Sequence, residues 1–250
     1  MLSALFFDQD GVIVDTERDG HRVAFNTTFR EFGIDAFWDE ATYGELLKIG
    51  GGKERMRAFF DRSENAALLR GEEPNALIAE LHKRKTEVFV ELITSGALPL
   101  RPGVERLMVE ANRKGVVVAI CTTSNEQAAQ AVAERLLKNV KVAFILSGDI
   151  VRCKKPDPEI YHLALERSGL EPARCLVIED SQNGVEAARA AQLRVVATVN
   201  AYTERENLDQ ASAVVSCLGD GSLDPARLIR GPAGFVVGGE VRIEALELLL

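Results

Sequence analysis

Two aspartates separated by one residue, Asp8 and Asp10, are the first residues in the chain that could do chemistry. They come directly after an apolar run, residues 2–7. In an extended segment, side chains two positions apart point the same way. One carboxylate could then attack a phosphoryl group to form an aspartyl-phosphate, while the other gives a proton to the leaving oxygen. In a later step, the second carboxylate could take a proton from the water that attacks the phospho-enzyme. On its own, Asp-x-Asp-Gly more often marks a turn or a calcium loop, so the prediction depends on other groups joining the pair.

Further polar groups follow later apolar runs in the same way. They are Thr122, Thr123 and Ser124 after 116–121, Lys155 in the loop after 142–146, and Glu179 and Asp180 after 175–178. In open α/β sheets, ligands bind outside the carboxyl ends of the strands. The order of these groups predicts that all of them meet at one edge of a sheet.

The predicted meeting point holds four carboxylates, which repel one another unless a cation lies among them. Mg²⁺ prefers hard oxygen ligands, so we expect it as the cofactor. Phosphoryl transfer also requires neutralisation of charge on the phosphoryl oxygens. The Lys155 ammonium and the Thr122 hydroxyl are the groups expected to help there. We therefore predict Asp8, Asp10, Thr122 and Lys155 as catalytic residues.

The elements that must position these groups can be read from the apolar pattern. Near-continuous apolar strands alternate with helices from residue 104 onward, which is typical of a parallel sheet with helices on both faces. Residues 16–97 look helical throughout, and the Pro/Gly-rich stretch 99–103 reads as a linker. We expect an α/β core made of 1–15 and 98–250, with 16–97 inserted as a helical cap whose hinges lie near Asp15 and 98–102. Residues 235–243 resemble a hairpin with a Gly-Gly turn, and no role is assigned to them.

Composition limits the classes of partner. The formal charge of −8 argues against nucleic acid and membrane surfaces, which require a basic stripe. No apolar run approaches membrane-spanning length, and the apolar start is too short for a signal peptide. The four cysteines lack a CxxC motif and fit a reducing compartment. We expect a cytoplasmic monomer that binds a small phosphorylated sugar.

The motifs together resemble the haloacid dehalogenase-like superfamily. Residues 6–12 resemble its first motif, with Val12 where Thr is common; Thr122, Lys155 and residues 179–184 resemble the other three. The resemblance implies a Rossmann-like core with a helical cap, Asp8 as nucleophile and Asp10 as acid and base. It also implies Mg²⁺ held by Asp8, the Asp10 carbonyl and Asp180, with Glu179 assisting.

Within that superfamily, residues 21–26, 50–55 and 101–104 resemble the CbbY-type phosphatases, which act on xylulose-1,5-bisphosphate. The spacing from Asp15 to His21 is one residue longer than usual there. The stretch 50–53 is not a P-loop, but its glycines beside Lys53 could hold a second, non-reacting phosphate. The substrate-binding residues expected from this resemblance are Glu17, His21, Gly51, Gly52, Lys53, Lys85, Thr123 and Ser124.

Two alternatives remain open from the sequence. A β-phosphoglucomutase shares nearly the same motifs and would return the phosphate to the sugar. A phospho-responsive signalling module also combines aspartates, Thr/Ser and a lysine on a parallel sheet, but it would show a long-lived phosphorylated form without turnover.

Overall fold

The computed structural model describes residues 1–47, 49, 52–69, 74–124 and 126–250. The chain divides into two compact units, one made of residues 1–15 and 99–250 and the other of residues 16–98. The first unit is built around a seven-stranded sheet, and the second is helical in its described ranges. None of the helices in these ranges has the length and apolarity needed to cross a membrane.

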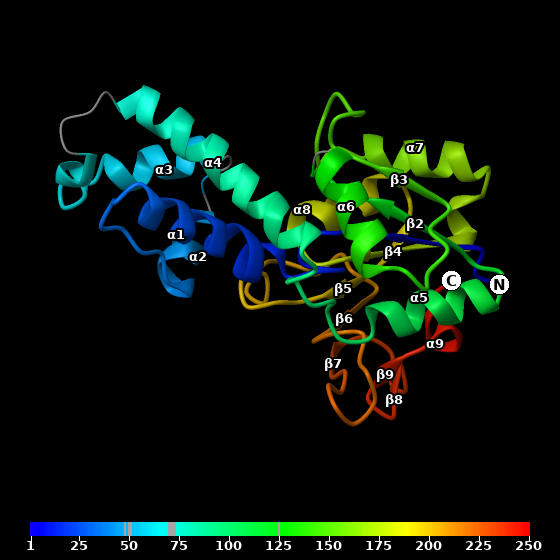
Figure 1. Ribbon diagram of the computed structural model, residues 1–250. Helices are drawn as coiled ribbons and strands as arrows, with labels where there is room; N and C mark the ends of the chain where they lie inside the picture. The colour runs from blue at the N-terminus through cyan, green and yellow to red at the C-terminus, as the bar shows by residue number, and fades with distance from the viewer. Residues whose placement is uncertain (48, 50–51, 70–73, 125) are drawn as a thin grey trace. The chain divides into compact units, whose positions relative to one another are not determined.

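The sheet has the strand order β3-β2-β1-β4-β5-β6-β7 (Figure 1). All neighbouring pairs are parallel except β6 and β7, which are antiparallel. The strands are β1 (Ala4–Phe7), β2 (Val117–Cys121), β3 (Phe144–Leu146), β4 (Cys175–Glu179), β5 (Arg194–Thr198), β6 (Ala213–Val215) and β7 (Leu228–Arg230). Every residue of β1 and β4 is buried, as expected for central parallel strands covered on both faces. The register aligns Phe7 of β1 with Ile178 of β4, so Asp8 and Glu179 leave the sheet at the same edge.

Helices cover both faces of this sheet. In Figure 1, α5 and α7 lie on opposite sides of it. Helices α7 and α8 share one apolar cluster with the strands, and α5 packs against β2. The helices are α5 (Val104–Arg113), α6 (Glu126–Leu136), α7 (Glu159–Ser168), a 3₁₀ turn (Pro172–Arg174), α8 (Gln182–Ala190) and α9 (Ile243–Glu247). The predicted Rossmann-like sheet with helices on both faces is confirmed.

The tail after residue 199 contains elements that the apolar pattern did not predict. Strands β6 and β7 have three residues each, and the outer strand β7 is largely exposed, so neither gives a long apolar run. The predicted hairpin is confirmed as β8 (Val236–Val237) and β9 (Glu240–Val241), joined by Gly238 and Gly239 with φ of 59° and 78°. Both angles lie in the left-handed region, which glycine adopts without the strain of a Cβ.

The second unit is held by an aromatic core. Trp38 is fully buried and packs against Phe25, Phe29 and Phe59, with ring centroids 4.6, 5.0 and 5.3 Å away. The helices are a π-helix (Thr16–His21), α1 (Arg22–Glu31), α2 (Glu40–Leu47), α3 (Gly52–Phe60), a 3₁₀ turn (Ala66–Leu69) and α4 (Pro74–Thr94). The described part of 16–98 contains no strand, in agreement with the predicted all-helical insertion.

Candidate active site

The Asp8 side chain lies at the end of β1, with only 6% of its surface exposed. The Lys155 ammonium donates hydrogen bonds of 2.6 Å to Asp8 Oδ1 and 2.6 Å to Glu179 Oε1. It also donates to the main-chain oxygen of Cys121, at 2.9 Å. One buried ammonium therefore joins the ends of β1, β2 and β4, which makes Lys155 the electrostatic centre of this edge.

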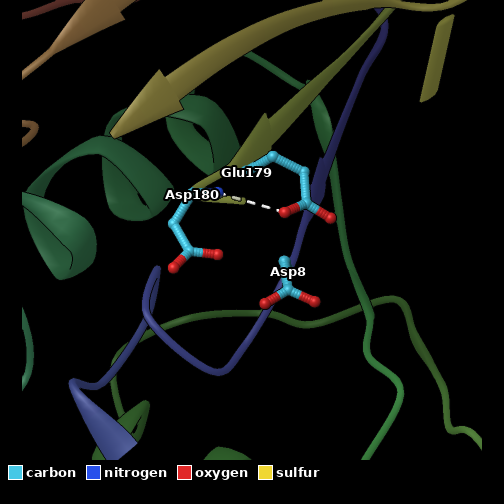
Figure 2. A group of neighbouring side chains, drawn as sticks. All are labelled: Asp8, Glu179 and Asp180. Carbon is cyan, nitrogen blue, oxygen red and sulfur yellow. Dashed lines mark hydrogen bonds between the residues drawn. The ribbon is translucent and has the colours of Figure 1, made fainter. Parts of the chain in front are cut away.

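Three carboxylates surround the same point. Figure 2 shows Asp8 at the end of β1 and Glu179 and Asp180 at the end of β4. A ligand oxygen from each lies within 4.8 Å of the others, and all three side chains are buried. Carboxylate oxygens at this spacing are the donor set that Mg²⁺ prefers, so the residues present fit the predicted cation.

Burial and mutual repulsion raise the proton affinity of this cluster. Burial, opposed by Lys155 and reinforced by Glu179 and Asp10, raises the pKa of Asp8 to about 8. Burial, Glu179 and Asp8 likewise hold the pKa of Asp180 well above its usual range. Without a cation the protein favours protonated carboxyls here, and a divalent ion would remove that preference.

The Glu179 carboxylate is held from several directions. Tyr161, fully buried on α7, donates its hydroxyl to Glu179 Oε1 at 2.7 Å, and the Asp180 amide donates to Oε2 at 3.0 Å. A Cβ on Gly184 would lie 1.9 Å from the Glu179 carboxyl carbon, so only glycine leaves room at that position. Sequence reasoning missed Tyr161, because its place in an apolar helix pattern predicts a core residue and nothing more.

Asp10 belongs to a second group at the same edge. Its Oδ2 accepts a hydrogen bond of 2.5 Å from the Ser124 hydroxyl, and the Thr122 hydroxyl lies 3.4 Å away. The Glu126 amide at the start of α6 donates to Asp149 Oδ2, at 2.8 Å. The Asp10 side chain is not among the three clustered carboxylates, so a metal-binding role for Asp10 through its main-chain carbonyl stays a prediction.

Other predicted and unpredicted groups complete the edge. Thr123 is half-buried, and its main-chain oxygen accepts from Lys154 at 3.2 Å; its substrate-binding role stays a prediction. Asn200, two residues beyond β5, donates to Asp180 Oδ2 at 2.7 Å. Sequence reasoning missed Asn200, although it follows a predicted strand just as the other site residues do. The same rule could have found it.

In the helical unit, Glu17 is held by a buried pair. The Tyr43 hydroxyl donates to Glu17 Oε2 at 2.5 Å and accepts from Arg55 Nη1 at 2.9 Å. The Arg55 guanidinium also donates to the main-chain oxygens of Leu46, at 3.1 Å, and Ile49, at 3.4 Å. Arg55 therefore joins Glu17 to the end of α2. Neither Tyr43 nor Arg55 was predicted as a partner of Glu17.

His21 and Lys85 form the second polar pair of this unit. Lys85 Nζ lies 2.9 Å from His21 Nδ1 and above the Phe25 and Phe89 rings, at 4.8 and 5.3 Å from their centroids. Burial and the Lys85 ammonium hold the pKa of His21 well below its usual range. A neutral imidazole can accept a hydrogen bond from the Lys85 ammonium at Nδ1, and its Nε2–H then remains as a donor.

The segment Thr16–His21, where the spacing from Asp15 to His21 is one residue longer than expected from the resemblance, forms a π-helix. A π-turn closes a hydrogen bond from i to i+5 rather than i+4, so it takes up one residue without displacing those that follow.

The glycine-rich stretch is described in part. Gly52 begins α3, and a Cβ there would lie 2.9 Å from the His82 ring, so this position favours glycine. Lys53 follows in the first turn and is exposed. Gly51 lies outside the described residues. The described substrate-binding candidates of the helical unit thus lie in three places. Glu17 contacts Tyr43, His21 pairs with Lys85, and Gly52 and Lys53 begin α3.

Comparison with known proteins identifies the family. Residues 2–192 match the haloacid dehalogenase-like hydrolases. A CBBY-like protein of Arabidopsis thaliana is 50% identical over 87% of this chain and 70% of its own length. A crystal structure of mutant CbbY from Rhodobacter sphaeroides, in complex with xylulose-1,5-bisphosphate, is 37% identical, with a TM-score of 0.69 and coverage of 87% and 95% of the two chains. A putative β-phosphoglucomutase from Thermotoga maritima is 27% identical, with a TM-score of 0.66 and coverage of 86% and 94%.

These matches confirm the family resemblance and the enzymatic class that the motifs predict. They span both the unit that carries Asp8, Lys155 and Asp180 and the helical unit inserted into it. The chain belongs to the haloacid dehalogenase-like hydrolases, among which it is similar to the CbbY proteins.

Proposed function

We propose that this hydrolase is a Mg²⁺-dependent phosphatase that removes a phosphate from a sugar bisphosphate, namely xylulose-1,5-bisphosphate. The observation that carries the proposal is the buried Asp8 carboxylate, which contacts Lys155 and lies within 4.8 Å of ligand oxygens of Glu179 and Asp180. This arrangement combines a nucleophile, a fixed cation and donors for a second, divalent cation.

The first step is attack of an Asp8 oxygen on phosphorus. The bond from phosphorus to the sugar oxygen breaks, and Asp10 transfers a proton to that oxygen. Lys155 holds Asp8 Oδ1 at 2.6 Å, which orients the carboxylate for attack. Ser124 holds the Asp10 carboxyl in place.

The second step frees the enzyme. Water attacks the phosphorus of the aspartyl-phosphate, Asp10 takes a proton from that water, and the bond to Asp8 breaks to release inorganic phosphate. When bound by Asp8, Asp180 and the Asp10 carbonyl, Mg²⁺ would neutralise charge on the phosphoryl oxygens. The Thr122 hydroxyl and Lys155 serve the same purpose from the protein side.

The proposed substrate rests on the helical unit and on the solved relative. Lys53 and Lys85 supply positive charge, and Glu17 and His21 supply a carboxylate and an imidazole for sugar hydroxyls. The similarity to a CbbY protein solved with xylulose-1,5-bisphosphate supports a bisphosphate over a monophosphate. Lys53, with Gly51 and Gly52, is proposed to bind the phosphate that does not react.

A mutase is the second candidate, supported by the similarity to a putative β-phosphoglucomutase and by the half-buried His21–Lys85 pair. A mutase would transfer the phosphate of Asp8 back to the sugar instead of to water. Membership of a hydrolase family counts against the signalling module.

A screen of sugar mono- and bisphosphates with Mg²⁺ tests these candidates, with Asp8→Asn as the inactive control. We expect release of inorganic phosphate, fastest from xylulose-1,5-bisphosphate, and no isomerisation of β-glucose 1-phosphate. Isomerisation without net phosphate release would establish the mutase. A stable phospho-protein with no turnover on any sugar phosphate would refute both enzymes.

A further inference from the structure

Arg101 joins several main-chain segments near the catalytic aspartates. One guanidinium nitrogen, Nη1, donates to the carbonyl oxygens of Gly11 and, at 3.1 Å, Thr198. The other, Nη2, donates to the carbonyl oxygens of Val199, at 2.6 Å, and Ser216, at 3.2 Å. Arg101 therefore links the Asp8–Gly11 turn to the ends of β5 and β6.

The main chain of the same segment follows the catalytic turn. The Arg101 amide donates to the Ile13 carbonyl at 2.9 Å, and Leu100 pairs antiparallel with Val14. The Gly11 amide in turn donates to the Val14 carbonyl at 2.8 Å. The turn that presents Asp10 is thus braced through its main chain as well as through the arginine fork.

Gly11 and Asp180 are in close contact at this point. Gly11 has a φ of 86°, and a Cβ there would lie 2.1 Å from Asp180 Oδ2 and 2.9 Å from Asn200 Nδ2. Asn200 follows β5 and holds Asp180 Oδ2 at 2.7 Å. Since Arg101 binds both Gly11 and the end of β5, it fixes the turn against the segment that holds Asp180. Its charge also lowers the pKa of Asp180, against the larger effect of burial.

We propose that Arg101 is a positioning residue that sets the distance between the Asp8–Gly11 turn and Asp180. Its donors hold the carbonyl oxygens of Gly11 and Val199, which adjoin Asp10 and Asn200 in the chain. A planar fork with several donors suits this task, and a lysine, with one ammonium, does not reproduce it. The proposal rests on the proposed function for its kinetic and Mg²⁺-binding readouts, and hydrogen exchange tests it independently.

Arg106 offers a matched control in the same unit. Its guanidinium donates to three main-chain carbonyl oxygens, of Gly219 at 2.9 Å, Leu218 at 2.9 Å and Val241 at 2.8 Å. These bonds join α5 to the tail and touch none of the catalytic groups. Replacing Arg106 therefore removes a similar set of bonds without disturbing the catalytic turn.

The experiment compares Arg101→Met, Arg101→Lys and Arg106→Met with the wild-type chain below their melting temperatures. For Arg101→Met we expect kcat on an aryl phosphate to fall about 100-fold and KM to change less than about threefold. Mg²⁺ affinity, measured by calorimetry, should fall about tenfold. Hydrogen exchange in peptides covering residues 8–14 should accelerate.

Arg101→Lys, which keeps the charge and is the more conservative change, should lose about tenfold in kcat. Arg106→Met should keep the kcat, Mg²⁺ affinity and residue 8–14 exchange of the wild type.

Equal losses of kcat in Arg101→Met and Arg106→Met would overturn the positioning role. A folded Arg101→Lys variant with the kcat and the hydrogen exchange of the wild type would overturn it as well. If the wild-type chain hydrolyses no phosphate ester, the proposed function fails. Hydrogen exchange still decides the role of Arg101 in that event, because it requires neither turnover nor a bound metal.

Discussion

The core site and the polar groups of the helical unit differ in the sign of their charge. At the sheet edge, the carboxyl groups of Asp8, Asp10, Glu179 and Asp180 gather around the Lys155 ammonium. In the helical unit, Arg55 is linked through Tyr43 to the Glu17 carboxylate. Lys85 contacts His21, whose lowered pKa favours the neutral imidazole. The first arrangement favours a cation, and the second favours an anion. This division of charge supports the proposal of a metal-dependent enzyme that acts on a phosphorylated substrate.

The two regions also differ in how they are assembled. The core carboxylates lie at the ends of β1 and β4, which are parallel neighbours, and Lys155 reaches them from the loop after β3. The helical groups come from side chains on separate helices, with Arg55 on α3 reaching Tyr43 and the end of α2. The register of parallel strands fixes a side chain at a strand end more narrowly than helix packing fixes a side chain on a helix surface. The same kind of core site can therefore be combined with different helical units and serve different substrates.

The largest effect should come from the nucleophile. We expect Asp8→Asn to reduce phosphate release by at least about four orders of magnitude, because the amide cannot form the covalent intermediate. Circular dichroism should show an intact fold, since asparagine has nearly the size and shape of the aspartate that it replaces. Residual activity within about tenfold of the wild type would mean that Asp8 is not the nucleophile.

Metal removal should affect the core site in a pH-dependent way. The pKa of Asp8 rises from 3.8 to about 8 on folding, so the folded chain binds more protons between these values. The free energy of unfolding without metal should therefore fall as the pH rises from about 4 to about 8. At a fixed Mg²⁺ concentration, set to a hundredfold excess over the Kd at pH 8, Mg²⁺ should restore about 2.7 kcal/mol at pH 8. The gain should be smaller at pH 5, where protons compete with Mg²⁺ for the carboxylates. Thermal unfolding with EDTA or Mg²⁺ measures this, and a stabilisation that does not grow with pH would contradict it.

Replacing Lys53 should distinguish binding of the non-reacting phosphate from the reaction at the other phosphate. We expect Lys53→Ala to lower kcat/KM for the bisphosphate about 10- to 100-fold, because a charge-assisted hydrogen bond to phosphate is lost. Activity on a small aryl phosphate should stay near the wild-type value. Lys83→Ala removes another exposed lysine from the helical unit and serves as the control. Equal losses on both substrates would refute a role in binding the second phosphate.

A matched pair of tyrosine variants tests the comparison directly. Tyr161→Phe removes the donor to Glu179 and should weaken Mg²⁺ binding about tenfold, measured by calorimetry. Tyr43→Phe removes the donor to Glu17 and should raise KM for the sugar phosphate while leaving Mg²⁺ affinity unchanged. If both variants shift the same parameter, the two regions do not divide cation and anion binding.

The smallest effect concerns the residue between the two aspartates. Gln9 is fully buried, and within the described residues its amide nitrogen and oxygen have no hydrogen-bond partner. Gln9→Met keeps the size of the side chain and removes an unsatisfied polar group, so we expect a gain of about 1 kcal/mol in unfolding free energy. The kcat should stay within about twofold. A loss of stability in urea unfolding would indicate that Gln9 is satisfied by water.

Residue type and order were enough to predict the sheet, the helical insertion and the convergence of the motifs. The prediction worked because each of Asp8, Thr122 and Glu179 follows an apolar strand, and parallel strands end together. It failed for β6 and β7, where three-residue strands lack an apolar run. It also failed for Tyr161, Tyr43 and Arg55, whose apolar or charged patterns fit ordinary helix positions.

The sequence by itself determined which groups could react and at which edge they would gather, since strand ends and residue types are local properties. Only the tertiary structure decided which oxygen each donor holds: Lys155 between Asp8 and Glu179, Ser124 on Asp10, and Arg101 across Gly11 and the ends of β5 and β6. Apart from the contact of Lys155 with Glu179, which spans 24 positions, these contacts join residues 90 or more positions apart, and no local pattern encodes them. They depend on how the packed layers bring distant side chains within hydrogen-bonding distance.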